Sequence, residues 1–152
     1  MLNEICGYGR FVSLSMPYAN AVALAKEALK EEGFGVLCEI DVAKTLKEKL
    51  GAEVAPHVIL GACNPILAQK ALEAEPNLGL LLPCNVVVRE SNGAVLVGAI
   101  DPQRMLEFAG NSALEPIAAD AAARLNRVLD CLKENAENSN NADFSTAFNT
   151  SC

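Results

Sequence analysis

The stretch of residues 56–65, which reads PHVILGACNP, constrains the fold more than any other part of the chain. Residues 54–62 are apolar on both faces of a predicted strand, which is typical of a central position in a sheet. Asn64 and Pro65 then form the N-cap and first-turn pair that begins many helices. A buried strand that leads directly into a helix predicts helices packed on a sheet, with Cys63 at the corner.

Hydrophobic periodicity predicts further elements along the chain. Apolar and alternating runs predict strands at 9–16, 35–42, 54–62, 84–90 and 94–100. Amphipathic stripes and capping residues predict helices at 20–32, 42–50, 65–74, 102–108 and 116–134. The segment between the third helix and the fourth strand is predicted to be irregular or extended.

Capping and turn residues set the ends of these elements. Gly33 and Gly51 predict left-handed helix ends, because glycine adopts positive φ without a steric cost. Asp41 and Asp101 predict helix N-caps. The Ser-Asn-Gly sequence at 91–93 predicts a tight hairpin turn between the last two strands.

This order of elements predicts an α+β fold. We expect a single mixed, largely antiparallel sheet of about five strands, with helices packed mainly on one face. Residues 1–134 are expected to form one domain. The composition of residues 135–152 changes to Asn, Ser, Ala and Thr, which predicts a flexible C-terminal tail.

Composition and charge limit the kinds of molecule that the protein is expected to bind. The chain is 51% hydrophobic and has a net charge of −7, so it can bury a core but gains nothing from counterion release on nucleic acid. The first residues do not resemble a signal peptide, and the longest apolar runs are too short to span a membrane. We therefore expect a cytoplasmic protein with no nucleic-acid or membrane partner.

The chain contains six cysteines, namely Cys6, Cys38, Cys63, Cys84, Cys131 and Cys152. A disulfide-held scaffold is not expected in an apolar chain of this length without an export signal. No Cys-x-x-Cys motif occurs, and the single histidine excludes a zinc-finger spacing.

Four blocks of sequence carry a family resemblance. They read GFGVLCEIDV at 33–42, LGACNP at 60–65, LLLPCNV at 80–86 and AIDP at 99–102. The order of these blocks and the residues within them resemble the sequences of the domain-of-unknown-function 302 family, over roughly Phe11 to Leu132. The resemblance implies a small α+β domain that forms homodimers. It implies no established activity, and it supplies no catalytic residues to carry over.

Cys63 is the first candidate for chemistry. A thiol at this corner would face the free N–H groups and the positive end of the following helix, which favours the thiolate. The alternative is a small, buried, apolar residue at a tight junction.

Whether Cys84 joins Cys63 depends on the path of the chain between them. A plain parallel crossover would leave the two sulfur atoms at opposite ends of the sheet. If the segment after the third helix runs extended, Cys84 begins a strand beside Cys63 and antiparallel to it. We favour the second path, which places Cys63, Asn64, Cys84 and Asn85 at one candidate ligand site.

Three other polar residues admit a functional interpretation. His57 shares a strand face with Cys63 but lies roughly 20 Å from it along the strand, so direct partnership is not expected. We interpret His57 as a strand-edge or dimer-contact residue. Glu39 and Asp41 could hold a cation or act as acid and base. We favour the alternative, a solvated strand edge with Asp41 as a helix cap, because capping alone explains Asp41.

Our first hypothesis from the sequence is a dimeric domain that binds a small ligand near the two cysteine blocks and is not an enzyme. The rival hypothesis is a thiol-based redox enzyme or sensor, or a metal-binding protein, that uses Cys63 and Cys84. A third is a structural dimer without a small ligand. The sequence identifies no cofactor.

Overall fold

A computed structural model describes residues 4–141 of the chain. Within this part there are six strands, which are β1 (Glu4–Cys6), β2 (Gly9–Leu14), β3 (Gly35–Asp41), β4 (His57–Cys63), β5 (Cys84–Ser91) and β6 (Ala94–Ile100). The α-helices are α1 (Tyr18–Glu31), α2 (Val42–Leu50), α3 (Pro65–Ala74), α4 (Pro102–Glu107) and α5 (Glu115–Asn141). Two short 3-10 helices, η1 (Pro76–Leu80) and η2 (Ser112–Leu114), precede β5 and α5.

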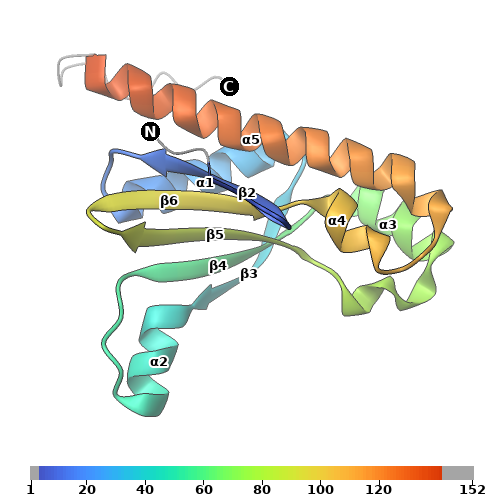
Figure 1. The fold of residues 1–152 in the computed structure, drawn as a ribbon, viewed down its shortest axis with the longest axis horizontal. Helices are drawn as coiled ribbons and strands as arrows, with labels where there is room; N and C mark the ends of the chain where they lie inside the picture. The colour runs from blue at the N-terminus through green and yellow to red at the C-terminus, as the bar shows by residue number, and fades with distance from the viewer. Residues whose placement is uncertain (1–3, 142–152) are drawn as a thin grey trace.

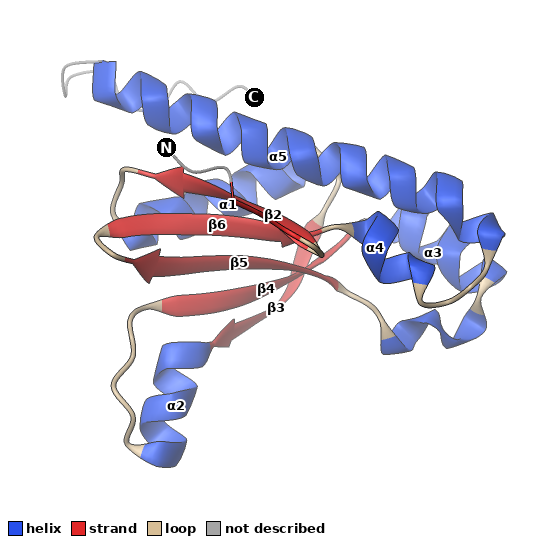
Figure 2. Ribbon diagram, in the orientation of Figure 1, coloured by secondary structure: helices blue, strands red, loops and turns tan. Residues whose placement is uncertain are grey.

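The strands form one sheet in the order β1-β2-β6-β5-β4-β3 (Figure 2). Every neighbouring pair is antiparallel. The tight turn between β5 and β6 has φ of 51° at Asn92 and 79° at Gly93, as the Asn-Gly sequence predicted. The predicted α+β class is therefore confirmed, with a sheet that is antiparallel throughout rather than mixed.

Two helices cover one face of this sheet. Helix α1 contacts β3, β5 and β6, and α5 runs across α1, β2 and β6 (Figure 1). Between the helices and the sheet lies an aliphatic core. Its fully buried members include Val12, Leu14, Leu29, Leu60, Val86, Val88, Val97, Leu125, Leu129 and Leu132. Burying these side chains supplies the main driving force for the fold.

Helix α2 differs from the others because it projects away from the helical layer (Figure 1). The side chain of Asp41 accepts a hydrogen bond from the backbone N–H of Lys44, and Gly51 ends the helix with φ of 67°. Both ends were predicted. However, none of its residues is buried within the single chain, so packing on the rest of this chain does little to hold it.

Among residues 4–141, no helical layer covers the second face of the sheet, and we call it the open face. The strand registers arrange its side chains in rows across the strands. The central row consists of Phe11, Gly98, Val87, Ile59 and Ile40. The row on one side of it contains Ser13, Leu96, Arg89 and His57, and the row on the other side contains Ile100, Asn85, Gly61 and Cys38.

Three predicted details are corrected by the structure. The segment expected to be irregular or extended contains the 3-10 helix Pro76–Leu80. A β-bulge between Val36 and Cys38 breaks the predicted alternation of β3, so these two side chains lie on opposite faces. The last helix continues to Asn141 and includes the first part of the predicted tail, whereas residues 142–152 lie outside the described part.

Candidate functional site

The two cysteine blocks meet at one end of the sheet, as the favoured path predicted. Strand β5 runs antiparallel to β4, and Cys84 lies directly opposite Ala62. Cys63 is therefore the neighbour of the residue that faces Cys84. Because side chains alternate along a strand, Cys63 projects to the open face while Cys84 projects into the core. The two thiols thus lie on opposite sides of the sheet, which does not favour a disulfide or a shared metal ion.

The surroundings of the two thiols agree with this placement. Cys84 is 8% exposed and belongs to the core, and burial, with a smaller contribution from Cys63, raises its pKa to about 11. Burial also raises the pKa of Cys63. For Cys63, this direction favours the alternative interpretation, a small residue at a tight junction, over the thiolate. In both cases the physical cause is removal of the thiol from water, which disfavours the charged form.

The two asparagines of the predicted site have different environments. Asn64 is 8% exposed, and its Oδ1 accepts a hydrogen bond from the backbone N–H of Leu67 at 3.1 Å. It is the predicted helix cap, and its Nδ2 atom lies against Gly33 at the end of α1. Asn85 is exposed on the open face. The predicted residues therefore share one end of the sheet but do not line one cavity.

Cys38 joins this part of the open face, although the sequence did not nominate it. It lies opposite Gly61, and its Sγ atom occupies the space that a Cβ on Gly61 would need, at 2.5 Å. Cys63 lies two residues beyond Gly61 on the same face. The β-bulge, which a period-two pattern does not reveal, brings Cys38 to this face.

The other polar candidates have structural roles in the described part of the chain. Asp41 caps α2, and Glu39 pairs with Lys26 of α1. His57 lies opposite Arg89 on the open face, and burial together with this guanidinium lowers the pKa of its imidazole. Within residues 4–141, neither carboxylate belongs to a group of three or more His, Cys, Asp and Glu side chains that could hold a metal ion.

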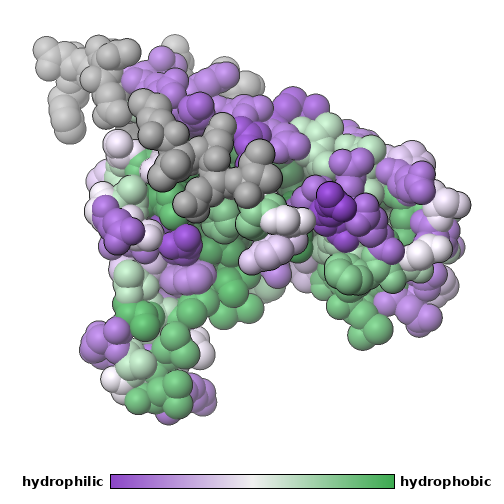
Figure 3. Space-filling view, in the orientation of Figure 1, coloured by the Kyte–Doolittle hydropathy of each residue, from purple (hydrophilic) through white to green (hydrophobic). Residues whose placement is uncertain are grey.

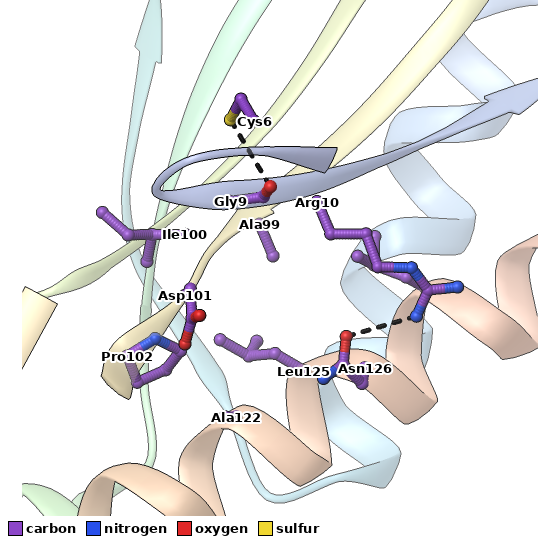
Figure 4. Close-up of a pocket in the computed structure, with 11 residues that line it drawn as sticks. Cys6, Gly9, Arg10, Ala99, Ile100, Asp101, Pro102, Ala122, Leu125 and Asn126 are labelled. Atoms are coloured by element: carbon purple, nitrogen blue, oxygen red, sulfur yellow. Dashed lines mark hydrogen bonds between the residues drawn. The ribbon is translucent and has the colours of Figure 1, made fainter. Parts of the chain in front are cut away.

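A cavity of about 180 Å³ opens between β2, β6 and α5, and none of the predicted site residues lines it (Figure 4). Its apolar wall includes Ala99 and Leu125, and its polar lining includes Arg10, Asp101 and Cys6. These residues come from three stretches that are far apart in the sequence, 6–10, 99–102 and 122–129, and neither a motif nor a spacing connects the three. Sequence reasoning missed the cavity for this reason.

Within the described residues, no group of three or more His, Cys, Asp and Glu side chains could hold a metal ion. Cys6, Cys38, Cys63 and Cys84 are free thiols, and Cys131 is disulfide-bonded. The same part of the chain contains no helix that is both long and apolar enough to cross a membrane.

Together these features define an α+β domain with one helix-covered and one open sheet face. The model of the domain of unknown function DUF302 matches residues 11–132, and the chain belongs to this family. A crystal structure of an uncharacterized conserved DUF302 protein from Bacillus stearothermophilus is similar, with 36% identity and a TM-score of 0.77. The match covers 82% of this chain and 98% of that one. No curated protein matches the sequence.

Proposed function

We propose that this protein is a homodimeric binding module, and that two copies pair through their open faces. The central row of the open face carries the proposal. Phe11, Val87, Ile59 and Ile40 lie in register across the sheet, whereas a water-facing side of an antiparallel sheet ordinarily presents polar residues. An apolar row of this length is more typical of a surface that becomes covered.

Exposed apolar residues extend this surface toward α2. Leu37 and Leu50 are 68% and 75% exposed, and Val54 follows α2 at 46%. Figure 3 shows apolar surface that continues from the sheet onto α2. A helix without a buried residue gains its packing if a partner covers it. The open face and α2 together therefore offer a partner one continuous surface.

A second copy of the chain suits this surface. In a two-fold dimer the same patch contributes on both sides, so an apolar row meets an apolar row and each α2 can reach across to the other copy. Family resemblance also implies homodimers. A stable interface of this kind buries at least about 1,000 Å² in total, which an open face and a projecting helix can supply.

Light scattering coupled to size-exclusion chromatography tests the proposal. The wild type is expected to be a dimer at micromolar concentration, and Ile59→Asp is expected to be a monomer with the same circular dichroism spectrum. Ile66→Asp is the matched control, because Ile66 is 68% exposed on α3. A monomeric wild type, or a dimer that survives Ile59→Asp, would contradict the proposal.

A small-ligand role at the open-face cysteines is the second candidate. The observation in its favour is the row in which Gly61 separates Cys38 from Asn85, so that a thiol and an amide flank a residue without a side chain. Thermal-shift measurements against metabolites and metal ions test this role, with Asn85→Ala as the variant that should lose any stabilisation. The raised pKa of Cys63 does not support the rival redox role.

A further inference from the structure

We infer that the cavity between β2, β6 and α5 is a binding site for a small zwitterion with its ammonium and carboxylate groups at opposite ends of a short hydrocarbon. No residue of either cysteine block lines the site, although Ile100, which belongs to a row of the open face, does. Its lining residues come from β1, β2, β6, the start of α4, and α5. Figure 4 shows Asp101 and Arg10 on opposite sides of the cavity, with Ala99 and Leu125 between them.

Asp101 supplies the negative end of the site. One of its oxygens, Oδ1, accepts a hydrogen bond from the backbone N–H of Gln103 at 2.9 Å and so caps α4. The ion pairs of the described residues do not include this carboxylate, and no hydrogen bond there uses its second oxygen. A carboxylate on a cavity wall without a cationic partner favours a ligand ammonium group.

Arg10 supplies the positive end of the site. Its Nη1 donates to Oδ1 of Asn126 at 3.2 Å, and its Nη2 donates to Asp130, so α5 holds the guanidinium in place. A guanidinium carries five N–H donors, and these two bonds leave the others for a ligand. The side chain is 22% exposed, which lets a carboxylate approach while limiting competition from water.

The remainder of the cavity determines the size and the polarity of the ligand that it can hold. Ala99 and Leu125 form an apolar wall between the two charges. A volume of about 180 Å³ corresponds to roughly six water molecules, and thus to a ligand of about seven non-hydrogen atoms. A straight chain with charges at its two ends fits this arrangement. An α-amino acid does not fit as well, because both of its charges lie on one carbon.

Cys6 provides a reporter for occupancy. Its thiol donates a hydrogen bond to the carbonyl oxygen of Gly9 at 3.4 Å, and the residue lines the cavity. A bound ligand is expected to slow alkylation of Cys6 by a maleimide. Cys38 is exposed on the open face and serves as an internal control in the same sample, because its alkylation rate should not change.

The test uses 4-aminobutyrate and 5-aminopentanoate as probes, with glycine, butylamine and butyrate as comparison compounds. At least one of the two probes is expected to raise the Tm and to slow Cys6 alkylation several-fold, measured by mass spectrometry. The comparison compounds are expected to do neither at the same concentration. Stabilisation by butylamine or butyrate equal to that by the probes would overturn the two-charge site, as would no effect of either probe.

Two variants test the charged ends of the site separately. Asp101→Asn keeps a good helix cap but removes the charge, and it should weaken binding of the probes at least about tenfold. Arg10→Lys keeps a cation for Asp130 but has three N–H donors instead of five and lacks the planar fork, so it should weaken binding as well. Glu107→Gln is the control, because its ion pair with Arg104 lies outside the cavity. Unchanged affinity in Asp101→Asn would overturn the proposal.

Discussion

The two faces of the sheet are built from the same strands but differ in what covers them. On β4, Val58 and Leu60 point into the helix-covered core and are 7% and 0% exposed. Their neighbours His57 and Ile59 point to the open face and remain half-buried. Both pairs of residues belong to the same strand, so the difference comes from the elements packed on each face. An apolar strand therefore need not be buried on both sides by its own chain.

The open face is nevertheless packed in places. The ring of Phe11 lies on Gly98, where a Cβ would come within 2.3 Å of the ring. The guanidinium of Arg89 stacks over the same ring at 5.6 Å from its centroid. This face is therefore an ordered surface in the single chain, which reduces the entropic cost of binding a partner there.

The largest expected effect separates the two faces directly. Leu60→Ala, on the covered face, should lower the free energy of unfolding by about 2–5 kcal/mol because it leaves a cavity in the core. Ile59→Ala, its neighbour on the open face, should cost about 1 kcal/mol in dilute protein. Urea titration of both variants measures the difference, and equal costs would show that both faces are equally buried.

The next effect tests the packing of the open face itself. Gly98→Ala should displace the Phe11 ring and destabilise the fold by about 1–3 kcal/mol, because the new methyl group has no space. Gly79→Ala is the control, since a Cβ added to Gly79 would meet nothing within 4 Å. Thermal unfolding of the pair gives the comparison. A neutral Gly98→Ala would mean that the ring moves freely.

A smaller effect distinguishes the two asparagines at the cysteine end of the sheet. Asn64→Ala should cost about 1–2 kcal/mol, because it removes the cap of α3 and leaves the N–H of Leu67 without its acceptor. Asn85→Ala, on the open face, should change stability by less than about 0.5 kcal/mol. Chemical denaturation measures both, and a reversal of this order would assign the structural role to Asn85.

The smallest expected effect is a pH dependence on the open face. Burial and Arg89 lower the pKa of His57, so the folded protein resists a proton that the unfolded chain accepts. The contribution of His57 to the free energy of unfolding should therefore be fully present above about pH 6.5, the ordinary histidine value. It should decline as the pH falls below this value. In His57→Gln this part of the decline should be absent. Unfolding midpoints at pH 7.5 and 5.5 provide the measurement.

Much of the fold was predictable because its signals are local. Asp41, Asn64 and Asp101 cap helices as expected, and Gly33 and Gly51 end them with positive φ. Each of these signals depends on a few neighbouring residues, whose preferences act before any tertiary contact forms. The bulge in β3 and the length of α5 were not predictable in this way, because both depend on the packing of partners distant in sequence.

The candidate sites were less predictable than the fold. The sequence correctly predicted that the blocks of Cys63 and Cys84 meet at one end of the sheet. It did not predict that the two thiols lie on opposite faces. One residue of register decides the face, and only the paired strand fixes that register. The sequence also left two interpretations of Cys63 open, because it does not give the burial that raises the pKa of this thiol.

The amino-acid sequence alone determined the order of the elements, their caps and turns, and the family to which the chain belongs. The tertiary structure decided which face of the sheet the helices cover and where Arg10, Asp101 and Cys6 meet. The physical reason is the separation along the chain over which each kind of interaction acts. Caps and periodicity act between residues a few positions apart, whereas a cavity or an uncovered face is created by strands and helices that meet from distant parts of the chain.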